Sequence, residues 1–247
     1  MFSFRCKFYP NNGDAKEFFD YALSWYLSAL SSNGQILGDW NLAHKSDALE
    51  LACIAPEEDS LDVKHNSVPA SDAYEKVLAR SERKPEYELA GSETILSGTC
   101  KCPDSSSLIL FTTCIHTEPP VLCADCGLHM PLYKLPRYKD DIDYTSILDW
   151  TSACRACDEL FLQSGAMERF GWKQLAEHDS DLTVRGLDIC KDLSAKLGKP
   201  VLYAIRTRPD KRVRNCPSCK SPWEIKDTGL SSFNLKCEAC GLASIGS

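Results

Sequence analysis

The stretch that most constrains the fold reads Cys216-Pro-Ser-Cys219 and, after seventeen further residues, Cys237-Glu-Ala-Cys240-Gly241. Each Cys-x-x-Cys pair fits a tight turn in which both sulfurs point into one concavity. Two such pairs at this separation can place four thiolates around one tetrahedral zinc ion. Zinc ligation by the four cysteines is therefore predicted, and the alternative is four unrelated reduced thiols.

The residues between these pairs predict a hairpin that brings the pairs face to face. Segments 223–225 and 233–235 alternate as short strands, and 227–229 is typical of a turn. The expected structure is a zinc ribbon over residues 209–247. A ribbon this small buries too little apolar surface to fold alone, so the metal would supply its folding free energy.

A second cysteine cluster precedes the ribbon. Cys123-x-x-Cys126 supplies two ligands, and Cys100 and Cys102 lie twenty residues earlier, across a strand and a turn that can return the chain. These four thiolates would complete a second zinc site, and the alternative is that they are reduced and merely packed. The reserve ligands are Cys114, His116 and His129.

Cys154-Arg-Ala-Cys157 has the spacing of a third metal pair, but its context favours a helix. Apolar residues step by three and four on one face there: Ile147, Trp150, Cys154, Cys157 and Phe161. A free cysteine behaves as a small hydrophobic residue in a core. We therefore interpret this pair as core packing.

The N-terminal segment predicts an α+β domain over residues 1–98. Its strands and helices are expected in the order strand, helix, strand, strand, helix and strand, at 1–9, 14–33, 35–42, 48–55, from 72, and 87–89. Asp14 to Glu17 resembles a capping box for the first helix. This order fits a split β-α-β sandwich of ferredoxin-like type.

Residues 99–208 are predicted to form a central domain. It begins with the second cysteine cluster and a buried strand at 108–115, and continues as a helical region from about 140 to 197. A further strand is expected at 201–207, followed by a basic connection at 208–215.

The amino-acid composition predicts the cellular location of the protein and shows that its charge is unevenly distributed. Fourteen cysteines without a charged leader or an apolar run of membrane length predict a cytoplasmic protein with metal ligation and no disulfides. The net charge is −7, but residues 199–247 carry nine Lys and Arg against four acidic residues. The first 198 residues therefore carry −12, which suits a basic protein partner and repels nucleic acid.

No motif for catalysis stands out. The sequence has no phosphate-binding glycine loop, nucleophile elbow or helical His-Glu-x-x-His motif, and its five histidines form no pattern. Four-thiolate zinc sites are closed and hence structural. These observations predict that the protein is not an enzyme.

Several motifs together resemble an uncharacterised family of bacterial zinc-ribbon proteins. They are Pro120-Val-Leu-Cys123-Ala-Asp-Cys126, Pro131-Leu-Tyr-Lys-Leu-Pro136, Met167-Glu-Arg-Phe170, Cys216-Pro-Ser-Cys219-Lys-Ser-Pro-Trp223 and Phe233-Asn-Leu-Lys-Cys237-Glu-Ala-Cys240-Gly-Leu-Ala-Ser244. The resemblance covers residues 95–247. It implies a bacterial cytoplasmic zinc protein of a family described as a domain of unknown function, for which nucleic-acid binding has been suggested.

Two functions remain open. The first is a protein-binding, immunity or antitoxin type of function, in which the acidic body captures a basic toxin domain and segments 57–59 and 140–143 are candidate contacts. The second is nucleic-acid binding by the tail, with Trp223 and Phe233 stacking on bases. The alternative for these two residues is that they form the core of the ribbon. The basic residues for that second function are Arg206, Arg208, Lys211, Arg212 and Arg214.

Overall fold

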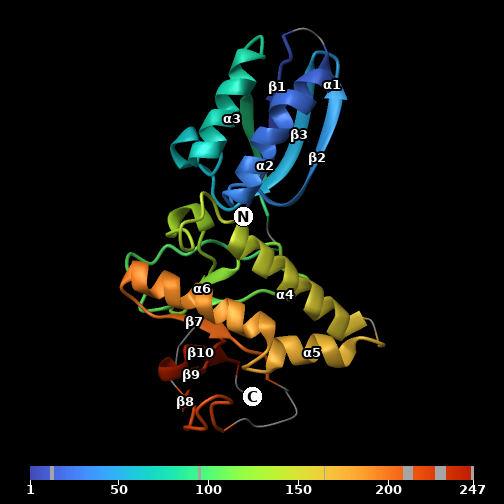
Figure 1. The fold of residues 1–247 in the computed structure, drawn as a ribbon. Coiled ribbons are helices and arrows are strands. Elements are labelled where there is room, and N and C mark those ends of the chain that lie inside the picture. Colours follow the sequence, from blue (N-terminus) through green and yellow to red (C-terminus); the bar gives the residue numbers. More distant parts are fainter. Residues whose placement is uncertain (12–13, 94–95, 164, 208–213, 226–231, 246–247) are drawn as a thin grey trace.

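The computed structural model describes residues 1–11, 14–93, 96–163, 165–207, 214–225 and 232–245 (Figure 1). Within them the chain forms two β-sheets, one in the N-terminal domain and one shared by the central and C-terminal segments. Figure 1 shows the N-terminal domain at one end of the molecule, the central helices in the middle and the C-terminal strands at the other end. The predicted mixed α+β class is confirmed.

The N-terminal domain is an antiparallel four-stranded sheet in the order β2-β3-β1-β4, with its helices on one face. Its elements are β1 (Phe2–Phe8), α1 (Ala15–Phe18), α2 (Ser24–Ser32), β2 (Leu37–Lys45), β3 (Ala48–Ala55), α3 (Val68–Ala79) and β4 (Glu86–Ser92). This connectivity is the ferredoxin-like order that the sequence predicted. The second helix begins at Val68, four residues before the expected start, because Ser67 caps it and Pro69 occupies its first turn.

Local sequence explains how this domain forms. In β1, Phe4, Cys6 and Phe8 are buried whereas Arg5 between them is exposed, as expected for a strand with one face in the core. Asp14 caps α1 by accepting hydrogen bonds from the backbone N–H of Lys16 and of Glu17, at 3.1 and 2.9 Å. A π-helical turn at Phe19–Leu23 then joins α1 to α2.

The second sheet has six strands in the order β6-β5-β7-β10-β9-β8. Its strands are β5 (Leu108–Leu110), β6 (Val121–Cys123), β7 (Val201–Ala204), β8 (Glu224–Ile225), β9 (Leu235–Cys237) and β10 (Leu242–Ser244). The helices beside it are α4 (Thr145–Gln163), α5 (Glu168–Ala176) and α6 (Asp181–Leu197). None of the helices in the described ranges combines the length and the apolar character needed to cross a membrane.

The C-terminal strands continue the central sheet instead of standing apart from it. β7 runs parallel to β5 on one side and to β10 on the other, with Tyr203 beside Leu242. One sheet therefore spans both sides of the predicted boundary at residues 208/209. Residues 208–213 of the predicted basic connection and the predicted turn at 227–229 lie outside the described residues.

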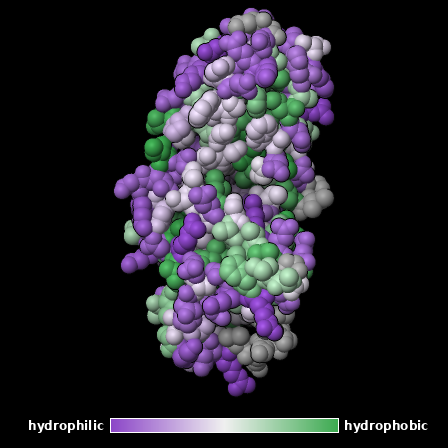
Figure 2. Space-filling model, turned by 45° about the vertical axis from the view of Figure 1, so that its right-hand side comes forward, coloured by the Kyte–Doolittle hydropathy of each residue, from purple (hydrophilic) through white to green (hydrophobic). Residues whose placement is uncertain are grey.

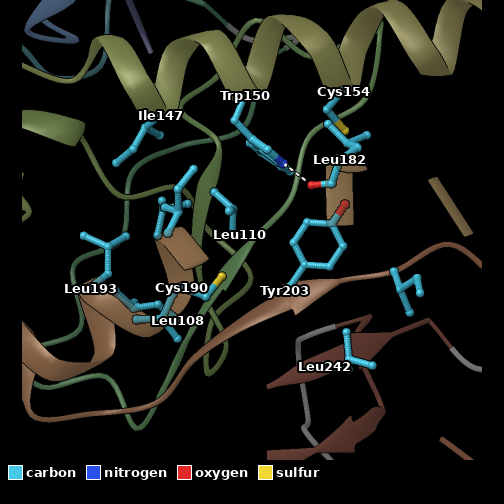
Figure 3. Close-up of a cluster of buried hydrophobic side chains, with 14 of the residues drawn as sticks. Leu108, Leu110, Ile147, Trp150, Cys154, Leu182, Cys190, Leu193, Tyr203 and Leu242 are labelled. Carbon is cyan, nitrogen blue, oxygen red and sulfur yellow. Dashed lines mark hydrogen bonds between the residues drawn. The ribbon is translucent and has the colours of Figure 1, made fainter. Parts of the chain in front are cut away.

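The core of this region forms where α4 and α6 pack on the sheet (Figure 3). Trp150 of α4 donates a hydrogen bond from Nε1 to the Leu182 carbonyl at 3.2 Å and meets the Tyr203 ring edge-on at 5.8 Å between centroids. Gly186 lets α6 approach, since a Cβ there would lie 2.1 Å from the Tyr203 ring. Cys154 is buried in the same cluster, as its place on the helical stripe predicted.

Candidate metal centres

The first cysteine tetrad assembles in the central domain. The four sulfurs of Cys100, Cys102, Cys123 and Cys126 all lie within 4.8 Å of one another. Cys123 ends β6, and the backbone N–H of Cys100 donates to the His129 carbonyl at 2.9 Å, which holds the first pair against the second. The backbone N–H of Cys102 also donates to the Cys100 sulfur at 3.3 Å.

The second tetrad assembles between β9 and the segment before β8. Its sulfurs, from Cys216, Cys219, Cys237 and Cys240, again lie within 4.8 Å of one another. The sulfurs of Cys219 and Cys237 are 3.7 Å apart, too far for a disulfide bond. Four sulfurs at about 2.3 Å from a tetrahedral zinc ion would be about 3.8 Å apart, so this spacing fits the metal.

The three Cys-x-x-Cys turns of the tetrads share one backbone form. The residue after each second cysteine has a left-handed φ angle, 73° at Gly127, 63° at Lys220 and 65° at Gly241. In the turns that end at Gly127 and Lys220, the N–H of that residue donates to the carbonyl of the first cysteine, at 2.9 and 3.0 Å. The expected left-handed conformation of Gly241 is confirmed, and Lys220 adopts it without the conformational freedom of glycine.

The thiols of the second tetrad differ in acidity. Hydrogen bonding to Ser221 lowers the pKa of Cys219 to about 6, whereas burial raises the pKa of Cys237 to about 12. Zinc binds the thiolate form, so Cys219 offers its ligand form at neutral pH and the buried thiols must lose protons as metal binds.

Both tetrads can therefore hold metal ions, and the reserve ligands take no part in either. Cys114, His116 and His129 belong to no group of three or more such side chains within ligand distance, among the residues that the structure describes. His129 instead shares a 2.6 Å hydrogen bond between Nδ1 and the Pro119 carbonyl oxygen. Cys6, Cys53 and Cys190 are buried free thiols, as expected for core cysteines.

The aromatic residues expected to stack on nucleic acid are part of the interior. Trp223 is 5% exposed and Phe233 is 6% exposed, in two different apolar clusters. Arg206 pairs with the buried carboxylate of Asp158 at 3.0 Å. Arg208, Lys211 and Arg212 lie outside the described residues.

The sequence analysis missed a buried carboxylate beside the first tetrad. Glu57 belongs to a segment predicted to be an exposed acidic loop, yet it is 4% exposed and paired with Lys101 and Lys134. The expectation that Glu57 is exposed is therefore wrong, whereas a partner contact at 57–59 stays a prediction. No sequence pattern marked it, because its partners lie more than forty residues away.

Comparison with protein families matches most of the chain, apart from residues 92–101, to domains of unknown function. Residues 1–91, 102–205 and 206–247 match three models, each described as a domain of unknown function (DUF8589, DUF2310 and DUF8594). A Haemophilus influenzae protein described as uncharacterised is 25% identical over 222 residues, which cover 86% of this chain and 85% of the relative. A second uncharacterised protein of that organism is 23% identical over 64% of this chain and 80% of its own length. These matches are consistent with an uncharacterised bacterial family.

Solved structures similar to this chain correct the prediction that the protein is not an enzyme. One is described as an antibiotic biosynthesis monooxygenase, with 11% identity, a TM-score of 0.29, and coverage of 38% of this chain and 99% of that one. A Caulobacter crescentus protein provisionally given the same description has 11% identity, a TM-score of 0.31, and coverage of 37% and 88%. We therefore withdraw the prediction, although TM-scores this low assign no reaction to this chain.

Proposed function

We propose that both tetrads bind Zn²⁺ and that the second tetrad with β8, β9 and β10 is a zinc ribbon built into the central sheet. Four sulfurs at tetrahedral spacing support zinc over metals that prefer oxygen ligands. The ion would supply the bonds that join Cys216 and Cys219 to the strand ending at Cys237. Such sites require reduced thiols, which a cytoplasmic location provides.

Metal quantitation tests this assignment. We expect two zinc ions per chain in protein purified without added metal, and one after either Cys126→Ser or Cys219→Ser. The control is Cys190→Ser, at a buried free cysteine outside both tetrads, which should keep both ions. Fewer than two ions in the wild type, or no loss in the variants, would contradict the assignment.

We further propose that the protein binds a basic protein partner through its N-terminal domain, in the manner of an immunity or antitoxin protein. The observation that carries this proposal is a pair of exposed aromatic side chains on one helical face, Tyr21 at 64% and Trp25 at 66% exposure. Tyrosine and tryptophan are enriched at the centres of protein interfaces and supply much of the binding energy there.

The surroundings of this pair specify the charge of the partner. Glu17 lies one turn before Tyr21 and pairs with Arg80 at 3.8 Å, and the exposed Asp20 lies directly before Tyr21. Ala22 and Leu23 are buried in the core on the opposite face of the helix. Residues 1–98 contain sixteen acidic residues against nine Lys and Arg, a net charge of −7. This domain alone therefore carries as much net negative charge as the whole chain. Figure 2 shows hydrophilic side chains at the top of the molecule, where this domain lies. An acidic surface around an aromatic pair favours a basic protein and speeds its association.

Nucleic-acid binding by the tail has less support. Its expected stacking residues, Trp223 and Phe233, are buried, and Arg206 is engaged with Asp158. The basic residues near the second tetrad have another explanation, because four thiolates and one Zn²⁺ would leave a net charge of −2 that cations stabilise. We therefore prefer the protein-binding proposal.

The test uses the basic protein encoded by a reading frame next to this gene as the probe. We expect a complex by calorimetry and size-exclusion chromatography, and a loss of affinity of about 100-fold or more in the double variant Tyr21→Ala, Trp25→Ala. Phe170→Ala removes an aromatic side chain of 48% exposure from the central region and should leave binding unchanged. No complex with the neighbouring product, together with a salt-dependent shift of DNA or RNA, would favour the tail instead.

A further inference from the structure

One of the contacts between the two domains is made by a buried carboxylate. Glu57 follows β3 in the N-terminal domain, and both of its oxygens are occupied by residues of the central region. Oε1 accepts from Lys101 Nζ at 2.8 Å and from Thr99 Oγ1 at 3.3 Å. Oε2 accepts from the Tyr133 hydroxyl at 3.0 Å and pairs with Lys134 Nζ at 2.5 Å. We call these five residues the Glu57 cluster.

The Glu57 cluster depends on all of its members. A carboxylate that is removed from water needs a full set of hydrogen bonds and a neutralising charge, because an unpaired buried charge is strongly unfavourable. A cavity of about 600 Å³, lined in part by Glu57, Lys101 and Lys134, adjoins the contact. Solvent is therefore close enough to replace the contact if the partners of Glu57 move.

The first tetrad sets the position of two of these partners. Thr99 and Lys101 stand on either side of Cys100, and Lys101 also precedes Cys102. When the sulfurs of Cys100 and Cys102 bind a metal together with Cys123 and Cys126, the backbone of residues 99–102 is fixed. Both partners lie on this segment.

The other two partners are held differently. Tyr133 and Lys134 belong to the turn Leu132–Lys134, whose Leu132 side chain is buried and lies against Gly34 of the N-terminal domain. This half of the cluster is positioned by packing, so it does not depend on the tetrad.

We propose that metal bound at the first tetrad docks the N-terminal domain onto the central region by holding Thr99 and Lys101 against Glu57. The inference rests on the metal assignment made above and goes beyond it, since a metal could bind there without affecting the domain contact. Loss of the metal frees the Cys100–Cys102 segment, withdraws half of the partners of Glu57, and opens the contact. The second tetrad lies in the far part of the other sheet and has no such effect.

Hydrogen exchange of residues 57–62, read by mass spectrometry with zinc counted on the same samples, tests the proposal. These residues are ordered by bonds from the Ser60 N–H to the Glu57 carbonyl at 3.2 Å and from the Glu57 N–H to the Ser60 hydroxyl at 2.8 Å. We expect Cys102→Ser to lose one zinc and to speed exchange there by about tenfold or more. The matched variant Cys219→Ser should also lose one zinc but leave exchange at 57–62 unchanged.

If Cys102→Ser does not fold, Cys126→Ser removes another ligand of the same tetrad and should give the same loss of zinc and the same faster exchange. A second pair of variants tests the other side of the contact, at Glu57. Glu57→Gln removes the charge that Lys101 and Lys134 neutralise, and Glu58→Gln changes the exposed neighbour. With both zinc ions retained, Glu57→Gln should speed exchange at 57–62 and Glu58→Gln should not.

The zinc count separates the two possible failures. A wild-type protein without metal at the first tetrad would overturn the metal assignment and the docking role together. Loss of that zinc with unchanged exchange at 57–62, or an equal effect of Cys219→Ser, would overturn the docking role alone.

Discussion

The two cysteine tetrads are alike in their ligands and differ in what surrounds them. Both contain four thiols within 4.8 Å, and both use turns that end in a left-handed residue. The second tetrad lies within a continuous sheet, where Cys237 ends β9 and Leu242 of β10 pairs with both β9 and β7. The first tetrad stands where two domains meet, next to the partners of Glu57. The same four-sulfur group can therefore complete a domain in one place and join two domains in another.

The largest effect is expected from the second tetrad. Cys237→Ser removes a buried ligand from β9, so we expect loss of the zinc ion and of the order of β8 to β10. Structural zinc contributes on the order of 10 kcal/mol to the folding of small zinc domains, and we expect a loss of at least about 5 kcal/mol here. That loss corresponds to a fall of about 10–20 °C in the midpoint of thermal unfolding, measured by calorimetry. A variant that keeps wild-type stability without zinc would show that sheet pairing alone holds these strands.

A smaller effect is expected from the first tetrad. Cys102→Ser should cost about 2 kcal/mol, less than breaking a fully buried ion pair because Lys101 is 75% exposed, and β5 and β6 remain paired without the metal. The far-UV circular dichroism spectrum should stay close to that of the wild type. The midpoint temperature of thermal unfolding, measured by calorimetry, should fall. If Cys102→Ser lowers the free energy of unfolding as much as Cys237→Ser does, the first tetrad supports the fold of a domain as the second does, and the proposed difference between them is wrong.

The sequence predicted much of this arrangement because metal knuckles and helix caps are local. All eight cysteines of the tetrads are brought together in the predicted groups, and Asp14 caps α1 where the capping box placed it. The helical stripe through Cys154 correctly indicated the side of α4 that packs in the core.

The features that the sequence did not reveal depend on contacts between distant segments. Glu57 was expected on the surface because it stands in an acidic run, and only the fold brings Lys101 and Lys134 to it. Trp223 and Phe233 were open to two interpretations until the sheet enclosed them. The junction of β10 with β7 could not be foreseen, since parallel pairing of distant strands leaves no mark in either strand.

The Glu57 cluster gives a pH test of the domain contact. Burial raises the pKa of Glu57, but hydrogen bonds from Lys101, Lys134 and Tyr133 outweigh it and leave the pKa below the ordinary value of 4.5. A carboxyl whose native pKa is lowered stabilises the fold fully above its unfolded pKa and loses that contribution as pH falls through the native one. Glu57→Gln should therefore cost about 1–2 kcal/mol at pH 7 and less below pH 4.5.

The solvent exposure of its partner limits that effect. The Lys101 side chain is 75% exposed, so the pair is screened and the cost stays under that of a fully buried one. The measurement is the difference between wild type and Glu57→Gln in denaturant unfolding across about pH 3–7, with Glu58→Gln as the control. A difference that does not shrink at low pH would mean that the charge of Glu57 is not what holds the contact.

The smallest expected effect concerns the left-handed residue that ends each turn. Lys220 has a φ of 63°. This left-handed conformation costs a residue with a side chain about 1–2 kcal/mol. Glycine adopts it without strain but loses about 0.5–1 kcal/mol of conformational entropy on folding. Lys220→Gly should therefore raise stability by about 0.5–1 kcal/mol, while Gly127→Ala and Gly241→Ala should each lower it by about 1 kcal/mol. A Cβ at Gly241 would meet only the Leu187 side chain at 3.5 Å, so that change tests the backbone and not a clash. Urea unfolding of the zinc-loaded proteins measures the stability of all three variants. The Lys220 side chain donates a hydrogen bond from Nζ to the Pro217 carbonyl at 2.5 Å. A loss of stability in Lys220→Gly would show that this bond contributes more than the backbone strain costs.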